Sequence, residues 1–218
     1  CRIPLQYVLG ECEFYGLRLL CDPRALIPRP ETELLVDVAL KYTPLDRPSV
    51  LADLGTGSGC LAIAVAVNRP LATILAVDIS QDALDLAQAN ARLHGAETRI
   101  RFFRGDLVAP LVAAGLADSV EGVLANLPYV AEDEYACLQP EVHYEPRQAL
   151  VSGPSGVEAY AKLAAQLHVL PRLRWAALEL PATRAQCILG LFRMDGWEKE
   201  LIKDYSGFDR VLLLVREP

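Results

Sequence analysis

The sequence lacks the features that mark secreted, membrane-embedded or metal-binding proteins. Its six cysteines, at positions 1, 12, 21, 60, 137 and 187, are widely scattered and include no CxxC pair. Because there is also no Cys/His cluster at zinc spacing, we expect reduced thiols in a cytoplasmic protein, and no metal site. The longest apolar run, Cys60 to Val67, is too short to cross a bilayer, and the N-terminus has no basic-then-apolar signal pattern.

Basic residues are few and dispersed. No basic run is longer than two residues, and 21 Lys and Arg against 28 Asp and Glu give a net charge of −7. Duplex binding draws its affinity from basic side chains that neutralise phosphates, so direct nucleic-acid binding is not expected, although a local basic patch stays open. Apolar residues are plentiful, because 52% of the 218 residues are hydrophobic, which is ample for a sizeable core.

From residue 50 onwards, short β-rich runs alternate with helical patterns, which is typical of a doubly wound α/β sheet. The segment 204–209 between the last two runs favours a hairpin, and therefore an antiparallel edge on a mostly parallel sheet of seven strands. The predicted strands are Val50–Leu54, Thr73–Val77, Ile100–Phe103, Val120–Ala125, Trp175–Leu180, Glu198–Lys203 and Arg210–Val215. The predicted helices are Cys60–Asn68, Gln81–His94 with Ser80 or Asp82 as its cap, Ser155–Val169 and Thr183–Met194.

The first 48 residues have a different pattern. Glycines at 10 and 16 separate short β-like runs, which predicts a small hairpin, and its expected strands are Leu5–Leu9, Cys12–Phe14 and Leu17–Cys21. Pro28 and Pro30 then enforce an extended segment before a helical face that ends at Tyr42. We therefore divide the chain into an N-terminal hairpin with a connecting helix (1–48) and a ligand-binding domain (49–218). Because the chain starts at Cys1 without a methionine, we also expect it to be a fragment.

A glycine-rich stretch, Asp53-Leu54-Gly55-Thr56-Gly57-Ser58-Gly59, follows one strand and opens a helix. In this context glycines let a nucleotide-like ligand approach the backbone at a helix N-terminus, although a tight turn has the same pattern. Asp78 and Asp106 follow the next two strands, so three acids are expected at one edge of the sheet, where open α/β sheets bind ligands. Asp78 lies 19 residues past Gly59, the position of an acid that accepts both ribose hydroxyls.

The spacing of this loop separates two kinds of cofactor. A dinucleotide requires GxGxxG, whereas this loop has GxGxG, with Asp53 two residues before it. A carboxylate there repels phosphates but suits the ammonium and sulfonium of S-adenosylmethionine. The loop therefore favours that methyl donor over a nicotinamide cofactor.

Asn126 stands where the fourth strand of the sheet ends, in the stretch Ala125-Asn126-Leu127-Pro128-Tyr129. One interpretation is a polar strand end followed by a simple turn. The other is functional: Asn126 Oδ1 and the Leu127 carbonyl, held outward by Pro128, accept hydrogen bonds from a planar NH2 group and orient its nitrogen. Tyr129 is then the face against which the planar group packs.

Asn126-Leu127-Pro128-Tyr129 is similar to the Asn-Pro-Pro-Tyr motif of amino-methyltransferases. Nearly the whole chain resembles the catalytic domain of the release-factor glutamine methyltransferases, the HemK family. Family-like motifs stand in order at residues 4–10, 14–16, 27–33, 53–59 and 144–146, and Ile27-Pro28-Arg29-Pro30-Glu31-Thr32-Glu33 is the most discriminating. The resemblance implies a class I methyltransferase fold, and methyl transfer from S-adenosylmethionine to the glutamine amide of a Gly-Gly-Gln motif in peptide-chain release factors. It also implies a helical N-terminal domain that ends where this chain begins.

Three sets of site residues follow. The catalytic set is Asn126, Leu127, Pro128 and Tyr129. The donor-binding set is Asp53, Gly55, Thr56, Gly57, Gly59, Asp78, Ile79, Asp106, Leu107 and Asn126; by the resemblance, Asp78 binds the ribose and Asp106 the adenine amine. The substrate-binding set is Arg29, Glu31, Thr32 and Glu145. Structural roles in place of substrate binding stay open for this set: a helix cap with an acidic turn for residues 29–33, and a loop salt bridge for Glu145.

The sequence departs from the family in two places. Leu127 replaces the first proline of the motif, which keeps a backbone carbonyl but gives up a rigid φ. Pro181-Ala182-Thr183 stands where the family has a glycine-containing turn after a Glu. Two other functions therefore stay open: adenine amino-methylation of DNA or RNA, against which the acidic balance and a missing target-recognition domain count, and a module that binds the donor without transferring its methyl group.

Overall fold

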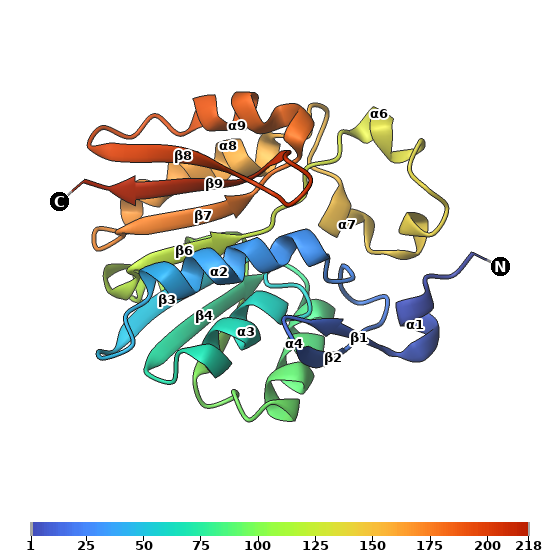
Figure 1. The fold of residues 1–218 in the computed structure, drawn as a ribbon, viewed down its shortest axis with the longest axis horizontal. Coiled ribbons are helices and arrows are strands. Elements are labelled where there is room, and N and C mark those ends of the chain that lie inside the picture. Colours follow the sequence, from blue (N-terminus) through green and yellow to red (C-terminus); the bar gives the residue numbers. More distant parts are fainter. Residues whose placement is uncertain (1, 218) are drawn as a thin grey trace.

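A computed structural model describes residues 2–217 of the chain. Within this range seven strands form one sheet, in the order β5-β4-β3-β6-β7-β9-β8 (Figure 1). Strands β3 to β7 are parallel to one another, and β9 pairs antiparallel with both β7 and β8. The predicted fold class, with its antiparallel edge, is confirmed.

The bounds of the elements are as follows. The strands are β1 (Glu11–Phe14), β2 (Leu17–Leu20), β3 (Ser49–Leu54), β4 (Ala72–Asp78), β5 (Ile100–Arg104), β6 (Gly122–Ala125), β7 (Trp175–Glu179), β8 (Trp197–Lys203) and β9 (Asp209–Arg216). The α-helices are α1 (Leu5–Leu9), α2 (Glu33–Tyr42), α3 (Cys60–Asn68), α4 (Gln81–Leu93), α5 (Ala109–Ala113), α6 (Glu132–Tyr135), α7 (Arg147–Leu150), α8 (Glu158–Gln166) and α9 (Ala185–Leu191). Short 3-10 turns are η1 (Pro30–Thr32), η2 (Ala117–Ser119), η3 (Val142–Tyr144), η4 (Leu167–Val169) and η5 (Ala182–Arg184).

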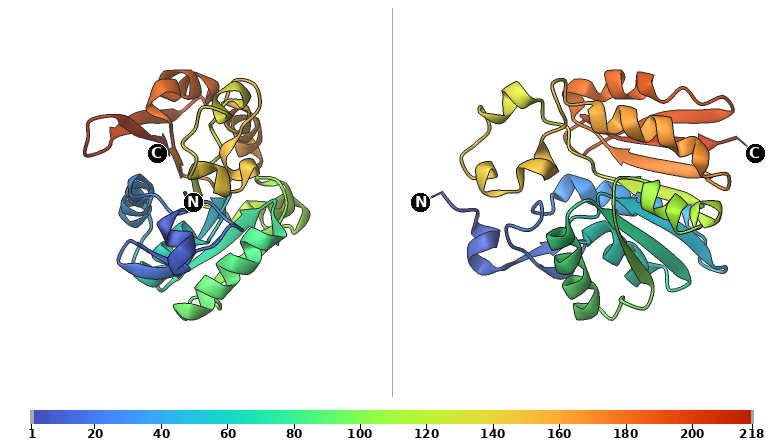
Figure 2. Two further views of the ribbon diagram at one scale, coloured as in Figure 1. Left: turned by 90° about the vertical axis from the view of Figure 1, so that its right-hand side faces the viewer. Right: turned by 180° about the vertical axis from the view of Figure 1, so that it is seen from behind.

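The central strands are apolar on both faces. In β4, Ile74 and Ala76 belong to one core cluster and Leu75 and Val77 to the other, as the two-residue period of a strand requires. Helices α2 and α3 contribute to the first cluster, and α5, α8 and α9 contribute to the second, so the sheet is covered from both sides (Figures 1 and 2). This double cover explains why the strands are near-continuous hydrophobic runs.

The helix predictions hold best where a residue fixes the end of the helix. Helix α3 has the predicted bounds, and α4 begins after Ser80, whose Oγ accepts a hydrogen bond from the Ala83 N–H at 3.2 Å. The helix predicted over 155–169 is shorter, because the Glu158 carboxylate binds the backbone N–H groups of Ser155 and Val157 and holds residues 155–157 as a turn. The helix predicted over 183–194 also starts late, after a 3-10 turn.

One N-terminal prediction is wrong. Leu5–Leu9 is not a strand but the single-turn helix α1, which starts after Pro4 and ends at Gly10. Gly10 has φ 75° and its N–H donates to the Gln6 carbonyl, so this glycine terminates a helix instead of separating two strands. The hairpin itself is confirmed as β1–β2, with Glu11 opposite Leu20. Phe14 and Leu19 from this hairpin share a core cluster with Leu51 of β3, and the domain boundary after residue 48 stays a prediction.

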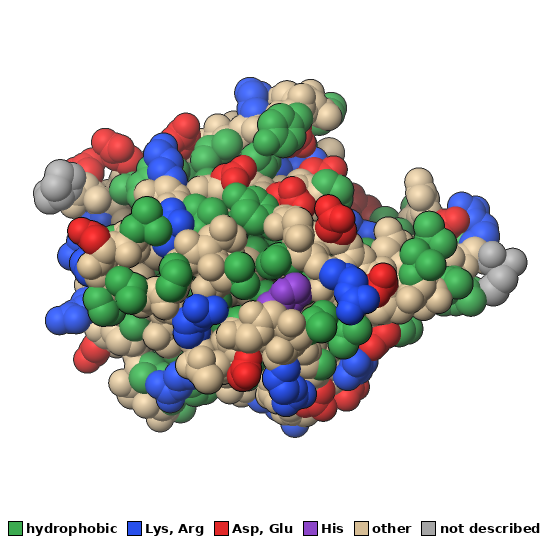
Figure 3. Space-filling model, turned by 60° about the horizontal axis from the view of Figure 1, so that its bottom comes forward, with side chains coloured by type: hydrophobic (Ala, Val, Ile, Leu, Met, Phe, Trp, Pro, Cys, Tyr) green, Lys and Arg blue, Asp and Glu red, His purple; other side chains and the backbone are tan. Residues whose placement is uncertain are grey.

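All five parallel strands end at the same edge of the sheet, on the right in Figure 1, where α1 and α7 also lie. The face shown in Figure 3 carries acidic and basic side chains interspersed with apolar ones, with no large basic area. Among residues 2–217, no helix has the length and apolar character that a membrane span requires.

Candidate active site

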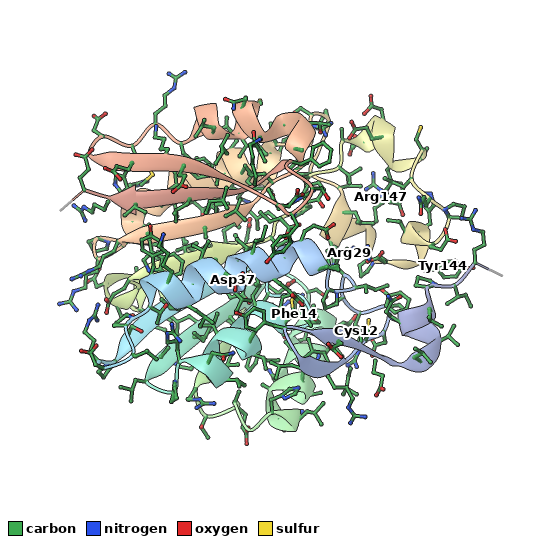
Figure 4. The ribbon with its side chains drawn as sticks, in the orientation of Figure 1. Cys12, Phe14, Arg29, Asp37, Tyr144 and Arg147 are labelled. Atoms are coloured by element: carbon green, nitrogen blue, oxygen red, sulfur yellow. The ribbon has the colours of Figure 1, made fainter. Side chains whose placement is uncertain are left out.

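A cavity of about 530 Å³ opens at the carboxyl ends of the parallel strands. Its volume is in the range of small-molecule sites. Arg29, near the start of α2, and Arg147, on α7, both line it, and Figure 4 shows them at the same end of the molecule. Of the predicted site residues, the cavity wall includes Arg29, Thr32, Gly55, Thr56, Gly57, Asp78, Ile79, Asp106, Leu107, Asn126, Leu127 and Pro128. Five lie outside the wall: Glu31, Asp53, Gly59, Tyr129 and Glu145.

The glycine loop connects β3 to α3 through residues with positive φ. Gly57 has φ 54°, and its N–H donates to Asp78 Oδ2 at 2.9 Å, which ties the loop to the end of β4. Gly59 has φ 81°, and a Cβ there would lie 3.0 Å from the Ala87 Cβ of α4. Gly57 therefore brings backbone to the cavity, whereas Gly59 lets two helices pack closely.

Asp53 supports the loop from beneath. Its side chain is fully buried, and its Oδ2 accepts hydrogen bonds from Thr56 Oγ1 at 2.6 Å and from the Ala62 N–H at 3.2 Å. Burial raises the pKa of Asp53 to about 7, against the effect of these two donors. Its Oδ1 has no hydrogen-bond partner among the described residues. The structure thus gives this acid a bracing role in the loop, and its predicted contact with a bound donor stays a prediction.

Asp78 lines the cavity, and backbone N–H groups donate to both of its carboxylate oxygens. Oδ2 accepts from the Gly57 N–H and Oδ1 from the Ser80 N–H, each at 2.9 Å. Burial raises the pKa of this carboxyl, and the backbone N–H groups act in the opposite direction. Ile79, the next residue, is half exposed and presents an apolar side chain at the same wall.

The third predicted acid has a partner that the sequence did not reveal. Asp106 forms an ion pair with Lys162 of α8 across the mouth of the cavity. Leu107 has φ 51°, a left-handed conformation that is uncommon for leucine, and its side chain is buried in the wall. Strained backbone of this kind concentrates at ligand sites.

Asn126 and Leu127 lie in the cavity wall directly after β6. Asn126 is half-buried, and its Nδ2 donates to Thr32 Oγ1 at 3.2 Å. The Leu127 carbonyl lies 3.2 Å from the Tyr160 hydroxyl, whose single proton is shared with the Glu179 carbonyl at 2.7 Å, and a lone pair of Leu127 stays available for another donor. The sequence indicated that Pro128 alone holds this carbonyl outward, and Tyr160 is an additional support.

Tyr129 contributes to packing in this structure. It lies against the core cluster under α8 and α9, outside the cavity wall. Burial, with a contribution from Glu179, raises the pKa of its phenol to about 12. Its predicted contact with a planar substrate group stays a prediction.

The four residues of the predicted substrate set have different environments. Arg29 lines the cavity and is paired with the buried Glu145, whose other oxygen accepts from the Ile27 N–H at 3.0 Å. Glu145 thus fastens the 27–29 segment to the loop before α7, which is the salt-bridge alternative. Thr32 is buried and contacts Asn126, whereas Glu31 is exposed.

Two further residues were missed by the sequence interpretation. Glu179, the last residue of β7, is buried, and burial raises its pKa to about 7. Thr32 Oγ1 donates to Glu179 Oε2 at 2.6 Å. The signal was an ionisable residue in an otherwise apolar predicted strand. Tyr160 gave no signal, because a tyrosine inside a helical pattern is usually a core residue.

The cavity fits the methyl donor that the sequence predicted. Two glycines expose backbone at its wall, and a Cβ on Gly55 would contact Leu127 Cδ2 at 3.3 Å, so a side chain would narrow the space. Asp78 presents a carboxylate that can accept hydrogen bonds, and Ile79 presents an apolar side chain. This pair of residues suits a ribose beside a flat ring. Among residues 2–217, no group of three or more His, Cys, Asp and Glu side chains is placed to hold a metal ion.

The sheet order and the glycine loop at its centre define a class I methyltransferase fold. Solved structures of this class share it. The N-terminal domain of human METTL16, solved in complex with SAH, has a TM-score of 0.62 and 16% identity over 94% of this chain and 77% of its own. The ribosomal protein L11 methylase from Lactobacillus delbrueckii subsp. bulgaricus has a TM-score of 0.59 and 21% identity over 90% of this chain and 84% of its own.

Sequence comparison identifies the family within this class of methyltransferases. The family model "Methyltransferase small domain" matches residues 31–153. The release factor glutamine methyltransferase of Chlorobaculum tepidum is 41% identical over 96% of this chain and 73% of its own length. The protein of the same name from Thermosynechococcus vestitus is 39% identical over 97% of this chain and 74% of its own length. The chain belongs to the release factor glutamine methyltransferase family, as the motifs indicated.

Proposed function

We propose that this protein is an S-adenosylmethionine-dependent methyltransferase that modifies the glutamine side-chain nitrogen in the Gly-Gly-Gln motif of a peptide-chain release factor. One observation carries the proposal: Asn126 and Leu127 line the same cavity as the glycine loop and Asp78. An amide acceptor and a carbonyl acceptor therefore lie beside a site suited to the methyl donor. The relatives' names supply the substrate, and the cytoplasmic location expected from the sequence is part of the proposal.

Two groups of residues hold the reactants. Gly55, Gly57, Asp78, Ile79, Asp106 and Leu107 hold the donor, with Asp53 and Gly59 supporting the loop behind them. S-adenosylmethionine, when bound, supplies a methyl group on a cationic sulfur that leaves as a neutral thioether. Asn126 Oδ1 and the Leu127 carbonyl accept the two N–H groups of the glutamine amide and fix the direction of its nitrogen.

The protein contributes mainly positioning. An amide nitrogen is a poor nucleophile because its lone pair is delocalised, and two acceptors on its N–H groups raise its electron density. The nitrogen becomes acidic only as it gains the methyl group, so its proton can pass to solvent without a strong base. Holding both groups in one cavity removes several kcal/mol of entropic cost. The cavity wall carries acidic and basic side chains together, so donor selection depends on local contacts such as Asp78 and not on net charge.

Mass spectrometry of the release-factor Gly-Gly-Gln peptide tests the proposal. The wild-type protein is expected to add one methyl group, and Asn126→Ala is expected to slow this by about 100-fold or more because one acceptor is lost. A release factor with Ala in place of the glutamine is the substrate control. Tritiated donor offered with duplex DNA and with ribosomal RNA forms the other arms. Methylation of nucleic acid but not of release factor would refute the proposed substrate.

A further inference from the structure

Three side chains from distant parts of the sequence form a hydrogen-bonded series behind the proposed acceptor. Asn126 Nδ2 donates to Thr32 Oγ1 at 3.2 Å, and Thr32 Oγ1 donates to Glu179 Oε2 at 2.6 Å. Thr32 and Glu179 are 2% and 1% exposed, so water does not compete for the bond between them, whereas Asn126 is half-buried at the cavity wall. Glu179 is not in the cavity wall, and its carboxylate is connected to the site through Thr32.

The direction of these bonds follows from what each group can donate. A threonine hydroxyl has one proton, and an ionised carboxylate has none. When Glu179 is ionised, the Thr32 proton must point to it, and the Thr32 oxygen then only accepts. Asn126 must therefore turn its NH2 group toward Thr32. The opposite amide orientation places Oδ1 against the Thr32 oxygen with no proton between them, which is unfavourable in a buried site.

We infer that Glu179 is a positioning residue, whose ionised carboxylate acts through Thr32 to orient the Asn126 amide and so presents Oδ1 to the substrate nitrogen. The inference rests on the proposed function, because the oriented oxygen is the acceptor for the glutamine amide. It gives Thr32 a role as the link between Glu179 and Asn126, and it explains why an acid is buried at the end of β7.

The second acceptor, the Leu127 carbonyl, also has a contact to the end of β7. The Tyr160 hydroxyl lies 2.7 Å from the Glu179 carbonyl and 3.2 Å from the Leu127 carbonyl. The side chain of Glu179 thus governs Asn126, and its backbone shares a tyrosine with Leu127. Because both acceptors are braced by the end of β7, their separation is set by the sheet and does not depend on loop geometry alone.

The ionisation of Glu179 depends on its surroundings. Burial is the main influence and raises its pKa to about 7; Glu31 acts in the same direction, whereas the Thr32 hydroxyl, Arg210 and Arg29 favour the charged form. Among residues 2–217, the phenols of Tyr129 and Tyr160 also face it. Protonated Glu179 can donate to Thr32, which frees the Thr32 proton to turn toward Asn126 Oδ1. The ordered form is therefore lost as pH falls through about 7.

The kinetic test measures kcat from pH 6 to 8.5, with donor Kd and Tm alongside. Wild-type kcat is expected to rise with pH through about 7. Glu179→Gln offers Thr32 both a donor and an acceptor, so its kcat at pH 8 is expected to be several-fold lower and to lose this rise. Thr32→Val is expected to lower kcat by about 10-fold, and the matched Thr32→Ser to restore it together with the pH dependence. Donor Kd is expected to stay the same in all variants.

Three kinetic results would overturn the inference: a pH profile of Glu179→Gln that matches the wild type, equal kcat for Thr32→Val and Thr32→Ser, or additive losses in the double variant Thr32→Val with Glu179→Gln. Residues that act in one series give non-additive effects. A purely structural role for Glu179 would lower Tm and leave the pH profile of kcat in place.

A spectroscopic readout separates this inference from the proposed function. The side-chain amide signal of Asn126, identified by its absence in Asn126→Ala, is expected to titrate near pH 7 in the wild type and not in Glu179→Gln. This measurement uses no release factor. A wild-type protein that shows the titration but methylates no release factor refutes the proposed function alone, whereas an amide signal that does not titrate refutes the inference alone.

Discussion

The two ends of the central sheet carry cavities of different kinds. The amino ends of the parallel strands lie on the left in Figure 1. The cavity there has a volume of about 870 Å³, which is larger than the 530 Å³ of the cavity at the carboxyl ends. Its charged side chains include the surface arginines Arg172 and Arg174 as well as Glu121, which pairs with Arg47, and the Arg174 side chain is 70% exposed. At the carboxyl ends the acids Asp53 and Glu179 are 0% and 1% exposed.

The comparison teaches that volume does not identify the functional end. Exposed guanidinium groups remain hydrated, so they have no desolvation cost that the fold must offset. A buried acid has a desolvation cost, and a protein keeps it where neighbouring groups hold it and use it. The smaller cavity has two such acids beside it, as well as backbone at positive φ and a leucine in a left-handed conformation. Buried acids and unusual backbone conformations therefore identify the functional site better than cavity volume does.

The largest expected effect comes from Asp78, in the cavity at the carboxyl ends of the strands. Asp78→Ala removes the predicted ribose acceptor and the partner of the Gly57 N–H, so we expect donor affinity to fall by about 100-fold in isothermal titration calorimetry. Arg172→Ala at the amino end is the control, and we expect its donor affinity and kcat to stay within about 2-fold of wild type. A strong loss in Arg172→Ala would mean that the larger cavity takes part in function.

A pair of glycine variants sharpens the comparison. Gly57 and Gly115 both have positive φ, at 54° and 68°, and neither has an atom closer than 3.9 Å to an added Cβ. Gly57→Ala and Gly115→Ala are therefore expected to lose similar stability, roughly 1–2 kcal/mol. Only Gly57→Ala is expected to weaken donor binding, by about 10-fold, because it faces the cavity. Thermal denaturation and calorimetry measure the two effects, and equal donor affinities would contradict the role of the loop.

The smallest effect is a difference in pH dependence between the two ends. Burial raises the pKa of Asp53 and Glu179 to about 7, so the stability that their protonated forms contribute is full below their ordinary pKa and is lost as pH rises through about 7. At the amino end, Arg47 lowers the pKa of Glu121, so that contribution is present above the ordinary pKa and is lost as pH falls. Between pH 5 and 8 the first effect dominates, and wild-type Tm should fall by several degrees.

Two variants separate these contributions in the same thermal measurements. Asp53→Asn cannot titrate, so it should show a smaller decrease in Tm between pH 5 and 8. Glu121→Gln should keep that decrease and differ from wild type only in acid. A decrease that is identical in wild type and Asp53→Asn would show that Asp53 is already ionised across this range.

Sequence alone predicted most of the fold, because its signals are local. The alternation of Ile74, Leu75, Ala76 and Val77 between two core clusters reflects a strand covered on both faces, and such a strand is a continuous apolar run. Leu5–Leu9 was misassigned because five residues are too few to show a period. A glycine such as Gly10 can end either a helix or a strand. The helix is recognised from its start after Pro4 and from the hydrogen bond between the Gly10 N–H and the Gln6 carbonyl.

The donor side of the site was also accessible to sequence reasoning, since Asp53, Gly57 and Asp78 are placed by strand order. The acceptor side was only half accessible. Asn126 and Leu127 were predicted from their motif and Thr32 as a substrate residue, but the contacts that hold the two acceptors were not predicted. Thr32 and Glu179 lie 94 and 53 positions from Asn126, and Tyr160 lies 33 positions from Leu127. Contacts at such separations leave no periodic trace in one sequence.

By itself, the sequence determined the doubly wound sheet, the glycine loop with its acids and the motif at Asn126, since propensity, period and spacing act between near neighbours along the chain. The tertiary structure decided that Thr32 connects Glu179 to the Asn126 amide, that Lys162 pairs with Asp106, and that Asp53 is fully buried. Burial and hydrogen bonding between distant segments set the charge and direction of these groups, and both exist only once the chain has folded.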